Sequence, residues 1–464
     1  MQMNNERLEY DALGEVRVSK TALYGAQSVR AVENFNITNQ KINPIMIWSL
    51  GAVKKACAQA NKEMGDLEPN IGNAIIRACE EVMEGAHNHE FITDPIQGGA
   101  GTSINMNVNE VIANRASQIL GEPIGTYLHV HPNDHVNKAQ STNDIIPTSG
   151  KLTTIILGEK LLYEMELMES VLNEKAEEFK SIIKVGRTHL QDAVLISMGQ
   201  VFKSYATFVK RDVKRLKYTL NEMKSINLGA TAVGTGVNSA IGYKEKAIQN
   251  LSNITGIRFE EAEDLVDSTK HVDGFAYVHA ELKTFATGLS RMCNDLRMMA
   301  SGPKVGLNEI NLPPKQPGSS IMPGKVNPVI PEVVNQVCFQ VIGNDTTITM
   351  ATEAGQMELN VFEPVLFFNL FQSMEILKNA CRTLRVNALD ELTINERQCH
   401  QYVEQSHAIG TSLVKELGYT KVSELTKQAL REDRTLRELV LESHLLSESL
   451  LNEKLYPQSM IRPR

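Results

Sequence analysis

Apolar residues recur at spacings of three and four through long parts of the chain, which is the pattern of one face of an α-helix. One such series is Phe202, Ala206, Val209, Val213, Leu216 and Leu220, and an earlier one is Leu161, Met165, Met168 and Leu172. Proline, which breaks helices, is absent between Pro147 and Pro303 and again between Pro364 and Pro457. The sequence therefore predicts unusually long amphipathic helices whose apolar faces pack together.

The segment from Val333 to Ile348 differs from these helices because it is apolar on most of its sides. A helix of this kind is typically buried in a large bundle. Clusters of glycine and proline at residues 94–103, 226–238 and 312–328 interrupt the helical pattern.

Together these patterns predict an all-α fold with a long central helical bundle. The chain has 464 residues, which is more than one hydrophobic core usually serves. We predict three domains: a mainly helical N-terminal domain (1–141), the central bundle (142–395) and a small helical C-terminal domain (396–464).

The composition of the chain limits what it can bind and where it is expected to occur. The net charge is -8 and no long basic run occurs, which argues against nucleic acid, because phosphate binding needs concentrated Lys and Arg. No stretch approaches the ~20 apolar residues that cross a bilayer, and the polar N-terminus does not resemble a secretory signal. The six cysteines include no CxxC pair, so we expect reduced thiols in a cytoplasmic protein.

Four polar segments stand out against the helical pattern, at residues 98–103, 131–144, 186–192 and 318–328. The first two, GGAGTS and HPNDHVNKAQSTND, have a structural explanation, because Ser, Thr and Asn cap helices; the same helix ends also attract anions. In the third, GRTHLQD, a histidine lies among polar neighbours. The fourth, GSSIMPGKVNP, places two hydroxyls, a lysine and an asparagine between glycines, as in a mobile catalytic loop.

Three histidines in or beside the second segment raise the question of a metal site: His129, His131 and His135. No carboxylate or thiol follows them at a convincing ligand spacing. We therefore predict no dedicated metal site.

GSSIMPGKVNP resembles the signature loop of the aspartase/fumarase superfamily. DPIQGGAGTS, HVNKAQSTND and GRTHLQD resemble the superfamily's other characteristic segments in the expected order, and the resemblance covers nearly the whole chain. Within the superfamily the chain is most similar to the ammonia-lyases that act on aspartate. Class II fumarases tend to carry Lys in place of Glu363 and a second Ser in place of Thr142. The segment YVEQSHAIGTSLVKELGY, near the C-terminus, departs from the family pattern.

The resemblance implies a function: reversible deamination of L-aspartate to fumarate through an enediolate, with interconversion of L-malate and fumarate as the alternative. It implies a homotetramer whose active sites each draw on three subunits. It implies no required cofactor and leaves activation by a divalent metal ion open.

The resemblance also implies roles for individual residues. Ser319 is expected to be the base, and His189 with Glu332 a supporting catalytic pair. Residues expected to bind the side-chain carboxylate are Thr102, Ser141, Thr142 and Ser320. Those expected at the alpha carboxylate are Thr188, Lys325 and Asn327, and Asn143 is expected, with His189, near the amino group. A catalytically silent bundle of the same fold is the remaining alternative.

Overall fold

The computed structural model describes residues 5–455, which fall into two compact units. Unit 1 comprises residues 5–162, Lys214–Thr284 and Phe339–Leu377. Unit 2 comprises Tyr163–Val213, Phe285–Cys338 and residues 378–455. Five long helices contribute residues to both units: α5 (Thr142–Glu178), α6 (Met198–Glu222), α9 (Asp273–Met299), α10 (Val329–Glu353) and α11 (Glu363–Leu384).

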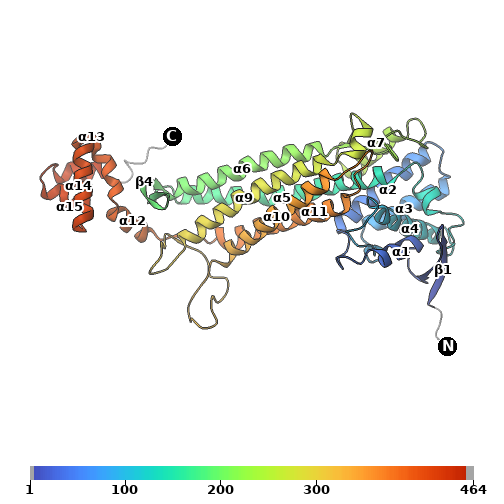
Figure 1. The fold of residues 1–464 in the computed structure, drawn as a ribbon, viewed down its shortest axis with the longest axis horizontal. Helices are drawn as coiled ribbons and strands as arrows, with labels where there is room; N and C mark the ends of the chain where they lie inside the picture. Colours follow the sequence, from blue (N-terminus) through green and yellow to red (C-terminus); the bar gives the residue numbers. More distant parts are fainter. Residues whose placement is uncertain (1–4, 456–464) are drawn as a thin grey trace. The chain divides into compact units, whose positions relative to one another are not determined.

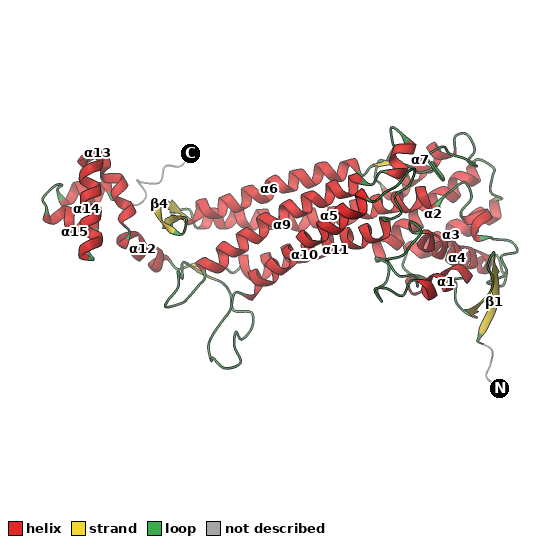
Figure 2. Ribbon diagram, viewed as in Figure 1, coloured by secondary structure: helices red, strands yellow, loops and turns green. Residues whose placement is uncertain are grey.

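Unit 1 also contains shorter elements (Figures 1 and 2). They are β1 (Glu6–Asp11), β2 (Gly14–Ser19), α1 (Ala26–Asn34), α2 (Pro44–Glu63), α3 (Pro69–Met83), η1 (Asn88–Glu90), α4 (Thr102–Ile119), η2 (Pro132–Val136), β5 (Ser225–Ile226), α7 (Tyr243–Thr255), β6 (Glu260–Glu261) and α8 (Leu265–Lys270). Local signals start several of these helices. At α2, for example, the Asn43 side chain accepts the Ile45 N–H, and Pro44 occupies the first helical position.

The long helices pack closely within unit 1. Phe275 of α9 meets Phe367 of α11 edge to face, with ring centroids 4.9 Å apart. Gly150 of α5 faces the same ring, and a Cβ at this glycine would lie 2.3 Å from Phe367. Only glycine therefore lets these helices approach so closely.

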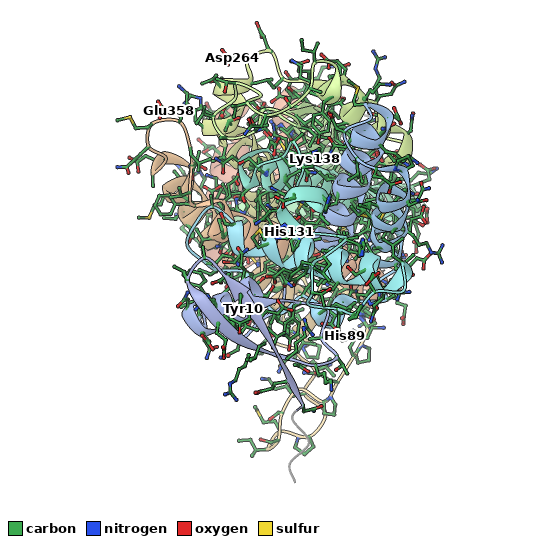
Figure 3. The ribbon with its side chains drawn as sticks, turned by 90° about the vertical axis from the view of Figure 1, so that its right-hand side faces the viewer. Tyr10, His89, His131, Lys138, Asp264 and Glu358 are labelled. Carbon is green, nitrogen blue, oxygen red and sulfur yellow. The ribbon has the colours of Figure 1, made fainter. Side chains whose placement is uncertain are left out.

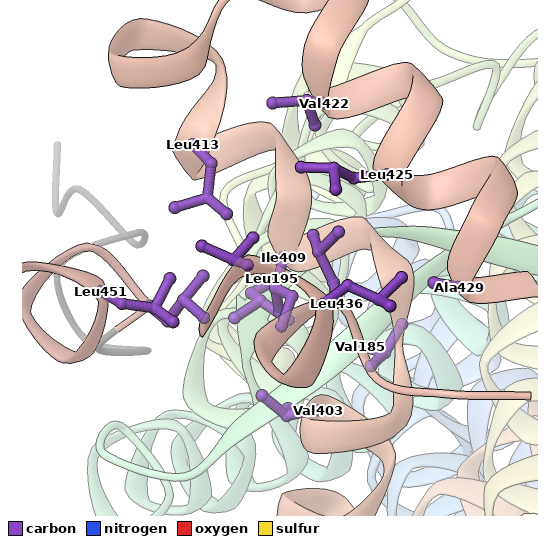
Figure 4. Close-up of a cluster of buried hydrophobic side chains, with 13 residues drawn as sticks. Val185, Leu195, Val403, Ile409, Leu413, Val422, Leu425, Ala429, Leu436 and Leu451 are labelled. Carbon is purple, nitrogen blue, oxygen red and sulfur yellow. The ribbon is translucent and has the colours of Figure 1, made fainter. Parts of the chain in front are cut away.

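Unit 2 holds the remaining elements. They are β3 (Ile183–Thr188), β4 (Gln191–Ser197), β7 (Ile310–Asn311), η3 (Arg385–Leu389), β8 (Thr393–Ile394), α12 (Glu396–Gln405), η4 (His407–Leu413), α13 (Val414–Leu417), α14 (Tyr419–Glu432), α15 (Leu436–Glu442) and α16 (Glu448–Lys454). Strands β3 and β4 form an antiparallel hairpin. Val185 and Leu195 of this hairpin share one apolar core with the C-terminal helices (Figure 4).

The predicted all-helical class is confirmed, and within residues 5–455 the strands form only four two-stranded sheets. The predicted apolar series in α5 and α6 are buried throughout. Within the single chain, residues 333–348 are buried on one face: Val334, Cys338 and Val341 are buried, whereas Phe339 is 61% exposed and Val333 43%. Burial of the other face in a larger bundle stays a prediction.

Two expectations from composition can also be compared with the structure. All six cysteines are free and buried. Among residues 5–455, no helix has the length and apolar character required to cross a membrane.

Candidate active site

The predicted site residues belong to both units. Unit 1 contains Thr102, Ser141, Thr142 and Asn143. Unit 2 contains Thr188, His189, Ser319, Ser320, Lys325, Asn327 and Glu332.

Thr102 begins α4 after a turn of unusual backbone conformation. Gly99, Ala100 and Gly101 have φ angles of 87°, 57° and 85°, in the left-handed region that glycine tolerates best. The Thr102 hydroxyl donates to the Gly99 carbonyl at 2.6 Å and remains exposed. A Cβ at Gly101 would lie 3.1 Å from Ile146 of α5, so this turn packs beside the first turns of α5.

Ser141, Thr142 and Asn143, here called the cap cluster, form the N-terminus of α5. Ser141 Oγ accepts the Asn143 N–H at 3.2 Å, so the predicted capping role is confirmed. Thr142 Oγ1 accepts a hydrogen bond from the Asn105 amide of α4 at 3.2 Å. The Asn143 amide donates to the Ala232 carbonyl at 2.7 Å. The structure thus brings the cap cluster and the Thr102 turn together at two helix N-termini, which favour anions.

Asp144, fully buried behind the cap cluster, ties it to the segment that follows β5. Its carboxylate accepts the backbone N–H groups of Ser141, Gly229 and Thr231 at 2.9, 3.0 and 3.1 Å. Burial raises the pKa of Asp144 to about 6, although these hydrogen bonds oppose the shift.

Lys54, from the middle of α2, binds the residues that precede the cap cluster. Its ammonium donates to Asn137 Oδ1 at 2.9 Å and to Gln140 Oε1 at 2.8 Å. Burial lowers the pKa of Lys54 to about 8. Sequence reasoning missed both Lys54 and Asp144. The only signal in the sequence was the adjacent pair Lys54 and Lys55 within a largely apolar stretch.

The histidines of this region have local structural roles. His131 Nδ1 accepts the N–H groups of Asn133 and Asp134, and His135 Nδ1 accepts the N–H of His131. His131 lies on the part of unit 1 drawn in Figure 3. In residues 5–455, no three His, Cys, Asp or Glu side chains are grouped as metal ligands.

Thr188 and His189 lie at the tip of the β3–β4 hairpin, where only a polar loop was expected. His189 and Leu190 have φ angles of 53° and 60° and form the two-residue turn. Positive φ at both positions is the type I′ geometry, which normally selects Asn and Gly. Each such residue costs on the order of 1–3 kcal/mol and is typical of functional sites. The side chains of Thr188 and His189 are both exposed to solvent at this strained turn.

Ser319 accepts two backbone hydrogen bonds in the signature loop, which we define as Gly318 to Pro328. Its Oγ accepts the N–H of Ile321 at 3.2 Å and that of Met322 at 3.0 Å. Hydrogen bonds donated to an oxygen favour its charged form over its protonated form. The neighbouring Ser320 is exposed, and no such pair of donors reaches its hydroxyl within the described chain. The geometry therefore distinguishes two serines that look equivalent in the sequence.

The signature loop closes on itself at a narrow neck. The Gly318 N–H donates to the Lys325 carbonyl at 2.8 Å, and the Asn327 amide donates to the Gly318 carbonyl at 2.7 Å. A Cβ at Gly318 would lie 2.4 Å from the Lys325 oxygen, so the neck requires glycine.

A cavity of about 530 Å³ adjoins this neck within unit 2. Its polar lining includes Arg297, Asn308, Lys325, Asn327 and Glu332. Glu332 lies in the first turn of α10, and within the described chain no hydrogen bond or ion pair joins it to His189. That predicted pair is therefore not formed inside one chain.

Comparison with known proteins decides the family. Residues 14–343 match the family model described as "Lyase", and residues 409–462 match "Fumarase C C-terminus". Aspartate ammonia-lyase of Bacillus subtilis (strain 168) is 49% identical, over 98% of this chain and 96% of that protein. The chain belongs to the aspartate ammonia-lyase family. The Helicobacter pylori (strain J99 / ATCC 700824) aspartate ammonia-lyase is 45% identical over 98% of both chains.

Solved structures of related lyases share the fold of this family member. The fumarate lyase:delta crystallin of Brucella melitensis, determined bound to cobalt, has a TM-score of 0.97 at 43% identity and covers 99% of this chain and 100% of its own. The class II fumarase of Schistosoma mansoni has a TM-score of 0.94 at 36% identity, covering 98% and 99%. The match at residues 409–462 shows that the small C-terminal region keeps the family pattern despite its unusual sequence.

Proposed function

We propose that the chain is a carbon–nitrogen lyase that converts L-aspartate reversibly to fumarate and ammonia. Family membership supports the reaction, since aspartate ammonia-lyases are 45–49% identical over nearly the whole chain. The observation that carries the chemistry is that the Ser319 oxygen accepts hydrogen bonds from two backbone N–H groups.

The reaction needs a base for a very weakly acidic proton on C3 of aspartate. Ser319, as an oxyanion, takes this proton, and the electron pair of the C–H bond passes into the side-chain carboxylate to form an enediolate. Collapse of the enediolate forms the C2–C3 double bond and breaks the C–N bond. The protonated amino group leaves as ammonia with the bonding electrons, so no general acid is required.

Negative charge on the side-chain carboxylate grows as the enediolate forms. The donors proposed to stabilise it are Thr102, Ser141, Thr142 and Ser320. Thr102 and the cap cluster lie at the N-termini of α4 and α5. This position supports the proposed role, because the aligned N–H groups of a helix N-terminus favour anions.

The remaining candidate residues hold the other end of aspartate. Thr188, Lys325 and Asn327 are proposed to bind the alpha carboxylate. Asn143 and His189 are proposed to lie near the amino group, with Glu332 orienting the His189 ring.

We propose a homotetramer in which three subunits contribute to each active site. The exposed apolar residues Val333, Phe339 and Met350 of α10 support this assembly, because a bundle with copies of the chain would bury them. The same assembly would allow His189 of one subunit to pair with Glu332 of another. The three domains 1–141, 142–395 and 396–464 remain our proposed division, and the six free, buried cysteines support a cytoplasmic location.

Fumarase activity is the second candidate, because a class II fumarase shares the fold at 36% identity. The test follows fumarate by ultraviolet absorbance with purified protein and either L-aspartate or L-malate. Fumarate from L-aspartate alone is the expected result. Fumarate from L-malate alone would replace the proposed reaction with hydration chemistry, and silence with both would favour a catalytically silent bundle.

A further inference from the structure

Glu309 is the most completely enclosed charge of unit 2, and two cations surround it. Its side chain has no exposed surface. The Arg187 guanidinium donates to Oε1 at 2.6 Å, and the Lys184 ammonium lies 2.7 Å from Oε2 as an ion pair. Removing the carboxylate from this group is costly, because two cations are then left without compensation.

The backbone of Glu309 is fixed as firmly as its side chain. Its N–H donates to the Met299 carbonyl at 2.8 Å, and its carbonyl accepts the Asn395 N–H at 2.9 Å. The next two residues form β7, which pairs with β8. Glu309 is therefore a fixed point on the scaffold of unit 2.

Arg187 links Glu309 to the tip of the β3–β4 hairpin. It precedes Thr188 directly, next to a β-bulge between Val185 and Arg187. The guanidinium lies over the Tyr402 ring, 5.4 Å from its centroid. The strained turn at His189 and Leu190 persists only if the surrounding structure holds its base in place. Val185 and Leu195 fix the hairpin further from the tip. Nearer the tip it is held by the pair of Arg187 and Glu309 and, on the other strand, by the Ser406 hydroxyl, which donates to Asp192 Oδ2 at 3.1 Å.

We propose that Glu309 is a positioning residue for the reaction, acting through Arg187 to hold Thr188 and His189 in their productive place. This inference rests on the proposed function, which assigns those two side chains to the substrate. A displacement of about 1 Å is enough to lower a rate by about 10²-fold, so loss of the anchor should appear in kcat.

The two cations provide a matched pair of variants. Arg187→Gln leaves the neutral pair of Lys184 and Glu309, and Lys184→Met leaves the neutral pair of Arg187 and Glu309. Both variants avoid an unpaired buried charge, so both should fold. Glu309→Gln removes the anchor while keeping Arg187.

The experiment measures kcat and KM for L-aspartate, together with amide hydrogen exchange of residues 188–191, in the wild type and the three variants. Glu309→Gln and Arg187→Gln should each lower kcat by about 10–10²-fold with a smaller change in KM, and both should speed exchange at the hairpin tip. Lys184→Met should leave kcat within about threefold of wild type, because Arg187 keeps its anchor.

Three outcomes would overturn the inference. One is normal kcat in a folded Glu309→Gln protein while Arg187→Gln is impaired, since Arg187 would then act on its own. Another is equal loss of kcat in Lys184→Met and Arg187→Gln, which indicates a general structural role. The third is unchanged hairpin exchange in both anchor variants. A wild type that forms no fumarate from L-aspartate would instead refute the proposed function, and the exchange data would still report on the anchor.

Discussion

The cap cluster and the signature loop carry the same kinds of side chain but are supported in opposite ways. Ser141, Thr142 and Asn143 begin a long helix. Two buried charged residues support this region: Asp144 accepts the Ser141 N–H, and Lys54 binds Asn137 and Gln140 just before the cluster. The signature loop is mostly exposed, and its hydrogen bonds at Ser319 and at the neck are made within the loop itself. Groups that bind a carboxylate gain from being fixed before the substrate arrives, whereas a base that must exclude water gains from a segment able to close.

The largest expected effect comes from removing the base on the loop. Ser319→Ala should lower kcat for L-aspartate by about 10⁴-fold, because this is the upper range for the loss of a general base. Thermal unfolding and the oligomeric state should match wild type, since the side chain supports only a surface turn. Ser320→Ala, the neighbouring control, should lose about 10²-fold through one donor. Near-normal turnover in Ser319→Ala would remove the base assignment.

Breaking the support of the cap cluster should reduce stability as well as activity. Asp144→Ala leaves three N–H groups, two of them buried, without an acceptor, at about 1 kcal/mol each, or about 3 kcal/mol in total. Urea denaturation of the wild type and of Asp144→Ala measures this loss of unfolding free energy. Asp134→Ala, at a side chain 77% exposed in the preceding segment, should change stability little. Equal stability of the two variants would show that the cap cluster does not depend on Asp144.

A change at the neck should separate activity from stability in the loop. Gly318→Ala forces a Cβ toward the Lys325 carbonyl and should open the neck. We expect kcat/KM to fall by about 10–10²-fold, with an unchanged melting temperature. Gln316→Ala, exposed in the same connection, serves as the control. A large drop in melting temperature for Gly318→Ala would mean that the loop is part of the folded core.

The smallest expected effect is a pH dependence of the free energy of unfolding, and it arises from Lys54 beside the cap cluster. Burial lowers the pKa of Lys54 from 10.5 to about 8, so between these values the folded protein has released a proton that the unfolded chain retains. The free energy of unfolding should therefore rise with pH in this window, by at most about 1.4 kcal/mol per unit from this group. Urea titrations of wild type and Lys54→Met from pH 8 to 10 measure the difference in slope. Parallel slopes would contradict the assignment.

The helices could be predicted from the sequence because their signal is local. The three-and-four spacing in α6 identified residues that are all buried, and Ser141 was recognised as a helix cap from residue type alone. The supports of the site were missed because their partners are distant in sequence. Lys54 and Asn137 are 83 positions apart, and Arg187 and Glu309 are 122 apart. A single sequence holds no signal for such pairings, nor for the β-turn that places His189 at a hairpin tip.

The most direct test of the whole account runs the reaction backwards from fumarate. Purified protein is given fumarate with and without ammonium, and the loss of fumarate absorbance is followed in both. We predict that fumarate disappears only when ammonium is present and that L-aspartate is formed, with Ser319→Ala inactive. Loss of fumarate without ammonium, with formation of L-malate, would contradict it.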